Sequence, residues 1–315
     1  MSEMEIRPAR SEDVPAILDV LGAALGETAL LKRTPEQWAW KHEHNPFGRS
    51  TVLIAWIAGR IAGVRAFMRW DLLSPTGHVV RCVRPVDTAT HPDFERRGVF
   101  KALTLEAVDL ARNEGIDLIF NTPNPRSGAG YMTMGWQEVG AIGVLVRPRF
   151  GASVPTDAGG IPDLDEVAPG AIAFRPIGGQ DRQPRGLRTP RTEDYQLWRF
   201  GSHPTVRYAT VNDGAGAAIV RVGVRNGRTE LVLSDLLFGA GRRAVSKAGA
   251  ANRGAYLAGF FSKGSPERAA AIQGRMFPVP GIKTLQLVAN PLTELDTDPF
   301  DLASWDIATS DLELL

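Results

Sequence analysis

The sequence has one cysteine, no long hydrophobic run and almost no net charge. Cys82 is the only cysteine among 315 residues, so disulfides within one chain and zinc sites built from several cysteines are excluded. No apolar run approaches the roughly 18 residues that a membrane helix needs. The N-terminus is charged from Glu3 onward and does not resemble a secretory signal. We therefore expect a soluble, cytoplasmic protein that does not bind a membrane.

The balance of charge also limits the partners. The chain has 36 Lys and Arg against 35 Asp and Glu, a net charge of +1, and no basic stripe longer than the short cluster at Arg96 and Arg97. This argues against nucleic-acid binding. His42 and His44 lack a third ligand nearby, so we expect no metal site. A composition of 43% hydrophobic and 23% charged residues is typical of a globular protein, and the length allows about two domains.

Residues 87–136 carry the strongest functional pattern. An extended run and a turn lead to Arg96, Arg97 and Gly98, where a helix with apolar residues at near 3.6-residue spacing begins. These arginines and Lys101 crowd the positive end of the helix dipole, which costs up to about 1 kcal/mol for each cation at a surface. An anion would offset that cost. Free N–H groups, a glycine and two guanidinium groups together favour a pyrophosphate site.

A second pattern follows downstream, after a strand-like run. Asn124, Tyr131, Gly135 and Trp136 have the spacing Asn-x6-Tyr-x3-Gly-aromatic. This pattern, placed after a phosphate loop, resembles the signature of the GCN5-related N-acetyltransferase (GNAT) superfamily. The resemblance implies that Tyr131 protonates the departing CoA thiolate, as the tyrosine at this position does in many members.

The loop departs from the family's pattern, Arg/Gln-x-x-Gly-x-Gly/Ala, at two positions. Glu95 lies where the pattern has Arg or Gln, and Phe100 lies where it has Gly or Ala. The Arg-Arg-Gly form of the loop resembles the variant of the tandem enhanced-intracellular-survival type, which accommodates Phe100. That type carries a third domain, for which this chain is too short. Glu95 has no explanation in the sequence.

The resemblance also implies how the donor binds. GNAT members hold the pyrophosphate of acetyl-CoA or another acyl-CoA on the loop amides, and they lay the pantetheine arm between two splayed parallel strands. The donor-binding residues implied on this chain are Thr88, Ala89, Thr90, Arg96, Arg97, Gly98, Val99, Phe100, Lys101 and Asn124.

The acceptor site in GNAT folds lies beside the first two helices. There Glu27, Trp38 and Phe47 are the candidate substrate-binding residues, and Trp38 and Phe47 are the poorer candidates for the core. The general base is left open among Asp87, His91, Glu27 and a chain of water molecules.

The order of predicted elements indicates a mixed α/β sheet in each of two lobes. Residues 1–149 read as a GNAT acyl-CoA-binding catalytic lobe, with the order βααβββαβαβ. Residues 150–170 are rich in Gly, Pro, Asp and Ala without a period, so we predict a linker. Residues 171–315 are then a second GNAT-like lobe.

A repeat supports the second lobe. Arg33, Thr34, Trp40 and Pro46 recur at one constant offset as Arg191, Thr192, Trp198 and Pro204, and an acidic and a basic position between them also match. Residues 238–243, where this lobe would carry its phosphate loop, lack the spacing of a CoA loop. We therefore expect the second lobe to be degenerate.

Three functions remain open from the sequence. The favoured one is an N-acetyltransferase that moves an acetyl or other acyl group from acetyl-CoA to a primary amine of a small molecule, by direct attack and with Tyr131 as general acid. The alternatives are a FemX-like aminoacyl-tRNA-dependent transferase, which would not need Arg96 and Arg97, and a non-enzymatic protein that binds acyl-CoA or a partner. The oligomeric state is left open between a monomer and a homo-oligomer.

Overall fold

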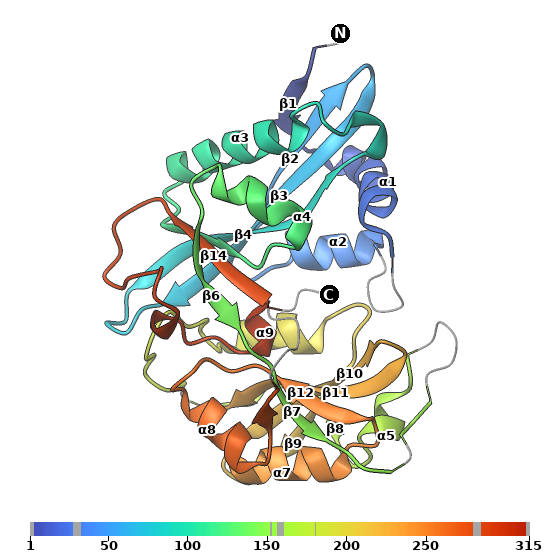
Figure 1. The fold of residues 1–315 in the computed structure, drawn as a ribbon, viewed down its shortest axis with the longest axis vertical. Helices are drawn as coiled ribbons and strands as arrows, with labels where there is room; N and C mark the ends of the chain where they lie inside the picture. The colour runs from blue at the N-terminus through green and yellow to red at the C-terminus, as the bar shows by residue number, and fades with distance from the viewer. Residues whose placement is uncertain are drawn as a thin grey trace. The chain divides into compact units, whose positions relative to one another are not determined.

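Two seven-stranded sheets organise the chain, one in each of two units (Figure 1). The structure is a computed structural model, and it describes residues 3–27, 33–151, 153–155, 161–179, 181–279 and 285–312. Unit 1 comprises Met1–Leu72, Val79–Val139 and Leu287–Phe300, and unit 2 comprises Leu73–His78, Gly140–Gln286 and Asp301–Leu315. Each sheet mixes parallel and antiparallel pairs, so the predicted mixed α/β fold of two lobes is confirmed.

Up to β6 (Gln137–Ile142), the elements of unit 1 follow the predicted order; β14 (Leu285–Pro291), from the last part of the chain, was not predicted in this lobe. The elements of the unit are β1 (Glu5–Pro8), η1 (Ser11–Asp13), α1 (Val14–Leu25), α2 (Pro35–His42), β2 (Thr51–Ile57), β3 (Arg60–Leu73), β4 (Val79–Thr90), η2 (Pro92–Phe94), α3 (Val99–Asn113), β5 (Leu118–Asn121), α4 (Pro125–Met132), β6 (Gln137–Ile142) and β14 (Leu285–Pro291). Thr34 caps α2 as expected, because its side chain accepts a hydrogen bond from the Gln37 amide at 3.2 Å.

Both faces of the unit 1 sheet are covered. Leu53 and Ala55 of β2 pack in one cluster with Leu103 of α3, whereas Ile54 packs in another with Ile17 of α1. Successive residues of a strand point to opposite faces, so α3 covers one face of the sheet and α1 the other. Figure 1 shows the two helices on these opposite faces. A strand buried on both faces leaves no solvated side for a polar residue, which makes any charged group within it conspicuous.

From β8 (Ile172–Ala173) to β13 (Phe277–Pro278), the strands of unit 2 correspond in order to those of unit 1. The elements of the unit are β7 (Leu145–Pro148), α5 (Leu164–Val167), β8 (Ile172–Ala173), α6 (Glu193–Gln196), a π-helical turn η3 (Leu197–Gly201), β9 (Tyr208–Asn212), β10 (Ala217–Arg225), β11 (Arg228–Leu237), α7 (Arg242–Ala251), β12 (Tyr256–Gly259), α8 (Pro266–Gln273), β13 (Phe277–Pro278), η4 (Leu302–Ser304) and α9 (Thr309–Leu312). Thr192 caps α6 through the Tyr195 amide at 3.1 Å, as Thr34 caps α2. Thr34 and Thr192, one matching pair of the repeat, therefore have the same capping role in both halves.

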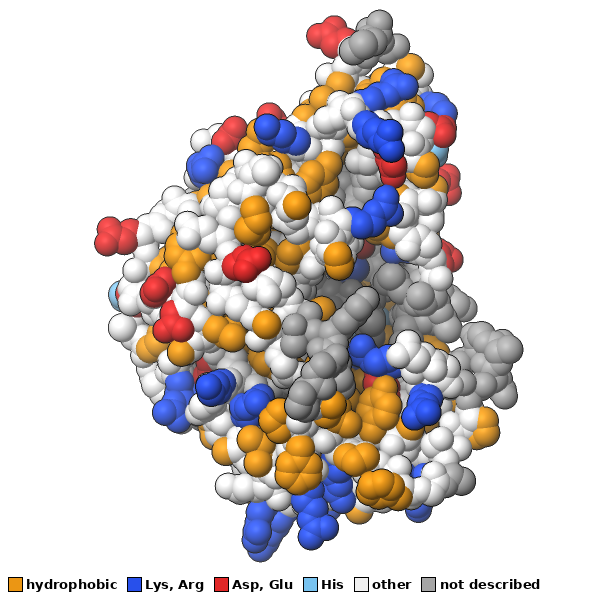
Figure 2. All heavy atoms as spheres, in the orientation of Figure 1, with side chains coloured by type: hydrophobic (Ala, Val, Ile, Leu, Met, Phe, Trp, Pro, Cys, Tyr) orange, Lys and Arg blue, Asp and Glu red, His pale blue; other side chains and the backbone are white. Residues whose placement is uncertain are grey.

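Two further features of unit 2 bear on the sequence interpretation. The segment predicted as a linker contains α5, whose Leu164 and Val167 are buried in the core of the unit. The second feature is a basic surface on α7, where Arg242, Arg243 and Lys247 are exposed. Figure 2 shows Lys and Arg side chains grouped at the place of α7 in Figure 1. Within the described part of the chain, no helix is long and apolar enough to cross a membrane.

The two sheets exchange one strand. Their orders are β1-β2-β3-β4-β5-β14-β6 and β8-β9-β10-β11-β12-β7-β13, so the same position is filled in each sheet. In unit 1 that position belongs to β14, which comes from the last part of the chain and pairs with β5. In unit 2 it belongs to β7, which follows β6 in the sequence and pairs with β12. Each sheet is thus completed by a strand from the other half of the sequence.

The exchange predicts that residues 1–149 do not fold by themselves. Without β14, β5 and β6 lose their shared neighbour, and their backbone donors and acceptors are left unpaired. We expect the fragment to lack the cooperative thermal unfolding that the full chain shows by circular dichroism. Residues 1–142 fused through a flexible linker to residues 285–300 are the matched control and should recover cooperative unfolding. A cooperative 1–149 fragment would contradict the role given to β14.

Candidate functional site

A cavity of about 420 Å³ opens in unit 1 where β4 and β5 diverge. The strands run parallel and pair at Cys82 with Leu118 and at Val83 with Ile119. Beyond this point the cavity lies between residues 85–90 of β4 and residues 121–124 after β5, and α4 and the first turn of α3 complete its walls. Cys82 lies in the paired part, where burial raises the pKa of its thiol, so its predicted buried position is confirmed.

The loop before α3 has the backbone of an anion site. Phe94 is 6% exposed and anchors the loop in the core, while Arg96 and Gly98 adopt left-handed φ angles of 62° and 77°. Alternation of right- and left-handed residues turns successive N–H groups toward one side, which forms a concave anion-binding nest. The first N–H groups of α3 have no acceptor within the helix. Glycine fits the left-handed conformation at residue 98 without strain.

The predicted donor-binding residues divide into two groups. Thr88, Ala89, Thr90, Phe100 and Asn124 line the cavity together with Tyr131. The others form the adjoining loop and first turn of α3: they are Arg96, Arg97, Gly98, Val99 and Lys101.

Two members of these groups have structural roles as well. Asn124 caps α4, because its Oδ1 accepts from the Ser127 amide at 2.9 Å. The Val99 side chain is 1% exposed and belongs to the core. For Val99, therefore, the group available to a ligand is the backbone N–H at the helix start.

Tyr131 lies at the inner wall of the cavity, on α4. Its side chain is 3% exposed, and its ring contacts Phe100 and Trp136 with centroids 5.5 and 5.0 Å away. Its Oη accepts a hydrogen bond of 2.6 Å from Nη1 of Arg65, a residue of β3. Sequence analysis missed Arg65. The only signal was an arginine inside the apolar run of a strand that is buried on both faces.

Phe100, one of the two departures from the family's loop pattern, packs edge-on against Tyr131. The arrangement needs a glycine at residue 130, because a Cβ there would lie 2.9 Å from the Phe100 ring. Gly130 of α4, which has no side chain, thus leaves room for the Phe100 ring. Together they fix the orientation of the Tyr131 ring.

Glu95, the second departure, faces a cation. Its carboxylate lies 3.6 Å from Nη2 of Arg126 in α4, and both residues line the cavity. The pair is exposed, so it contributes little to the free energy of unfolding. It places an arginine from α4 on the wall of the cavity, at the side where the family's loop has its own Arg or Gln.

Asp87 marks the bend at which β4 leaves β5. It has a φ of 40°, and its Oδ2 accepts from Lys41 Nζ at 2.9 Å and from His42 Nε2 at 3.0 Å. His42 Nδ1 in turn lies 2.9 Å from Ser50 Oγ. Burial alone would raise the pKa of Asp87, but Lys41 and His42 hold it well below its usual range. Burial lowers the pKa of His42, so its imidazole is neutral at pH 7.

The residues predicted to hold the acceptor do not meet at this cavity. Glu27 is exposed and accepts from the Arg33 amide at 3.3 Å. Trp38, expected to be a poor core candidate, is 7% exposed and packs in the core cluster of α1 and β2. Phe47 packs on Trp70 with ring centroids 5.3 Å apart. Their role in substrate binding stays a prediction.

The corresponding helix start in unit 2 carries its own anion. Helix α7 follows β11 as α3 follows β4, and β11 runs parallel to β12 as β4 does to β5. The Asp213 carboxylate accepts from the amide of Gly241, which precedes α7, at 3.1 Å and from the amides of Ala215 and Gly216 at 2.9 and 3.0 Å. Burial would raise the pKa of Asp213, but these donors hold it below its usual range. A protein carboxylate thus occupies the place that α3 leaves open to a ligand.

The comparison with known families agrees with this geometry. A family model described as acetyltransferase (GNAT) domain matches residues 5–139. Residues 5–139 of the chain are thus similar to a GNAT acetyltransferase domain. The match spans the cavity, the loop before α3 and Tyr131, and it supports acyl transfer as the general activity of this lobe. No curated protein sequence matched the chain.

Solved structures extend the GNAT fold to both lobes. A GCN5-related N-acetyltransferase from Anabaena variabilis is similar with a TM-score of 0.63 at 11% identity, over 92% of this chain and 73% of that one. Eis1 from Mycobacterium abscessus is similar with a TM-score of 0.58 at 16% identity, over 92% and 74%. A tandem GNAT protein from the clavulanic acid biosynthesis pathway is similar with a TM-score of 0.51 at 16% identity, over 93% and 100%. At these identities the likeness concerns the fold.

In the residues that the structure describes, no three His, Cys, Asp or Glu side chains are grouped so that they could hold a metal ion.

The cluster of Asp87, Lys41 and His42 should stabilise the folded protein. Asp87→Asn leaves Lys41 and His42 without their buried anion and should lower the free energy of unfolding by about 3 kcal/mol at pH 7. Because the pKa of Asp87 is depressed, its contribution is present above the ordinary Asp pKa of about 4 and is lost as the pH falls below it. The difference between wild type and variant in chemical denaturation should therefore shrink in acid.

Asp93→Asn is the matched control, since Asp93 pairs with Arg60 at 3.2 Å but both side chains are more than half exposed. It should change stability by less than about 1 kcal/mol. Equal effects of the two substitutions would show that the buried cluster does not stabilise β4.

Proposed function

We propose that the first lobe is an acyl-CoA-dependent N-acetyltransferase that acetylates a primary amine of a small molecule. The observation that carries the proposal is the meeting of three features at one cavity: the diverging strands, the free start of α3 and the Tyr131 hydroxyl. The residues fit acetyl-CoA as a donor. Arg96, Arg97 and the loop amides suit the pyrophosphate, and the gap between the strands suits an extended arm.

Acyl transfer needs a polarised carbonyl and an acid for the leaving thiolate. In the proposal, the amine nitrogen attacks the thioester carbon, and the developing oxyanion is stabilised by a backbone N–H of residues 88–90. The carbon–sulfur bond then breaks, its electron pair stays on sulfur, and the sulfur takes the proton of Tyr131. The product is an amide and free CoA.

The surroundings of Asp87, His91 and Glu27 make each of them a poor candidate for the general base. Asp87 is a weak proton acceptor, because Lys41 and His42 hold its pKa well below the usual range. His91 accepts the Asp93 amide through Nδ1 at 3.2 Å, and Glu27 is exposed beside Arg33. Of the candidate bases, we therefore favour water at the cavity as the acceptor of the amine proton.

The loop can be tested by making its helix start anionic. Gly98→Glu places a carboxylate and bulk against the proposed pyrophosphate position, and we expect binding of acetyl-CoA to fall below detection by calorimetry. Gly59→Glu is a closely matched control, since Gly59 has a φ of 79° against 77° for Gly98, and a Cβ has open space at both. The two variants should lose similar stability, but only the first should lose binding. Undiminished affinity in Gly98→Glu would remove the loop from the proposed site.

The chemistry can be tested through Tyr131. Tyr131→Phe removes the acid and should lower kcat by about 10²- to 10⁴-fold, with acetyl-CoA affinity unchanged, in an assay of CoA thiol release over a panel of small amines. Tyr208→Phe is the control, because Tyr208 is a buried tyrosine of unit 2 whose hydroxyl also accepts from an arginine, Arg199, at 2.5 Å. Full turnover in Tyr131→Phe would contradict its role as the acid. Binding of acetyl-CoA without turnover on any amine would favour a non-enzymatic protein.

A further inference from the structure

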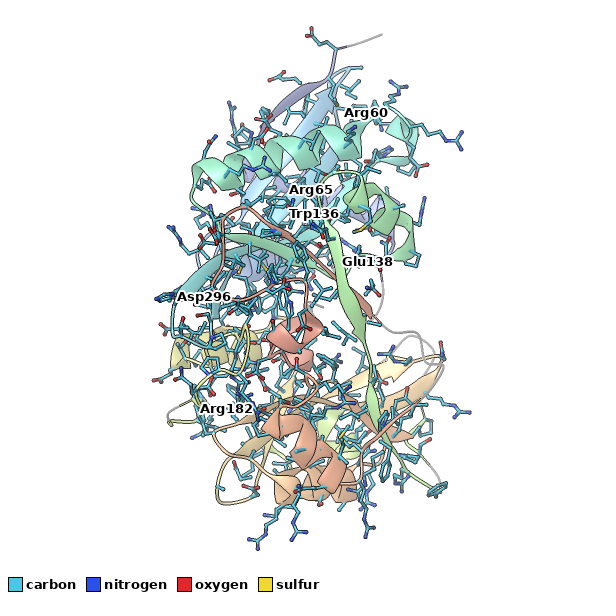
Figure 3. The ribbon with its side chains drawn as sticks, turned by 60° about the vertical axis from the view of Figure 1, so that its left-hand side comes forward. Arg60, Arg65, Trp136, Glu138, Arg182 and Asp296 are labelled. Atoms are coloured by element: carbon cyan, nitrogen blue, oxygen red, sulfur yellow. The ribbon has the colours of Figure 1, made fainter. Side chains whose placement is uncertain are left out.

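Arg65 is a buried cation without an anion. Its side chain is fully buried on β3, beneath α3 where Figure 3 labels it. Its guanidinium donates to two neutral oxygens, Tyr131 Oη at 2.6 Å and Thr104 Oγ1. Over the described ranges of the chain, no carboxylate forms an ion pair with Arg65. Such a charge is costly to bury.

The aromatic surroundings offset part of that cost. The guanidinium carbon lies 4.7 Å from the centre of the Phe100 ring, 5.4 Å from that of Tyr131 and 5.9 Å from that of Phe67. Some buried arginines of the chain pair with carboxylates: Arg191, for example, lies 2.7 Å from Asp235 and 2.8 Å from Asp311. At Arg65 the group that can become an anion is the Tyr131 phenol. Arg199 likewise donates to the Tyr208 phenol, but Tyr131 lines the cavity of unit 1.

We propose that Arg65 is a positioning residue that orients Tyr131 and serves as counter-ion to the oxyanion that Tyr131 becomes. The proposal rests on the proposed function. The O–H bond of Tyr131 breaks as the S–H bond of CoA forms, and the phenol oxygen keeps the electron pair next to the guanidinium. The proton that the amine loses then returns to the phenol oxygen through water, so that no further reactant is needed.

The hydrogen-bond geometry suits this task. Arginine donates only, so the Tyr131 oxygen must be the acceptor of the 2.6 Å bond, and its own hydrogen is left free to point elsewhere. The ring lines the cavity, and Phe100 packed against Gly130 fixes its orientation. A fixed cation in a site shielded from water needs no reorganisation when the charge develops, which is the most effective form of electrostatic stabilisation.

The test measures the Tyr131 phenol directly, in the unliganded full chain. The chain has four tyrosines, so ring-carbon NMR of labelled tyrosine gives few signals, and Tyr131→Phe assigns the relevant one. Arg65→Met should move its titration to higher pH, because the phenolate loses the adjacent cation. Arg65→Gln is a second neutral variant with the same expectation, should Arg65→Met fail to fold. An unmoved titration in a folded variant would overturn the proposal.

Arg84→Met is the matched control. Arg84 is also buried in the unit 1 sheet, over the rings of Trp70 and Phe120 at 4.9 and 5.3 Å, and it does not contact Tyr131. Its loss should leave the Tyr131 titration unchanged, whatever it does to stability. A shift as large as that in Arg65→Met would show a general effect of lost packing and would overturn the proposal.

Turnover gives an independent readout. Arg65→Met should lower kcat by about 10- to 100-fold with the KM for acetyl-CoA unchanged, and the upper limb of the pH profile of kcat should move to higher pH. A raised KM for acetyl-CoA with an unchanged kcat would assign Arg65 a structural role and overturn the proposal. If wild type turns over no amine, the proposed function fails, whereas the NMR titration still decides whether Arg65 acts on the phenol.

Discussion

The divergence of β4 from β5 is the constraint on which the rest of the site depends. The two strands pair at Val83 and Ile119, and β4 then bends through the left-handed Asp87. Lys41 and His42 hold that bend from α2, so α2 supports the cavity by fixing its strand, whereas Ala24 and Leu25 at the end of α1 line the cavity itself. The bend opens the space, α3 brings unpaired N–H groups to its edge, and α4 brings Tyr131 to its wall.

The two lobes show how one fold can keep or lose an anion site. Both place a helix after the fourth strand of the sheet and a parallel strand after the helix. In the second lobe the helix start is satisfied by Asp213, a group of the protein itself, whereas Arg96 and Arg97 surround the start of α3 without such a group. The strand exchange keeps both lobes necessary even if only one binds a ligand, because each sheet takes its sixth strand from the other half of the sequence.

Local signals in the sequence were sufficient for the elements and for part of the site. Caps such as Thr34, strand periods and the loop before α3 depend on neighbours in sequence, and their positions were predicted to within a few residues. Partners brought together by the fold were not predictable. Arg65 lies 66 residues from Tyr131, and Lys41 lies 46 from Asp87, so no short pattern records either contact. The exchanged strands were missed for the same reason, since β14 joins a sheet whose other strands end at residue 142.

The central claim is that the start of α3 and the adjoining cavity bind acyl-CoA. The most direct measurement is calorimetric titration of the full chain with acetyl-CoA, CoA and adenosine 3′,5′-bisphosphate, each in turn. We predict saturable binding of all three, with the bisphosphate weakest because it lacks the arm that would lie between the strands. The absence of binding at millimolar acetyl-CoA would contradict the claim.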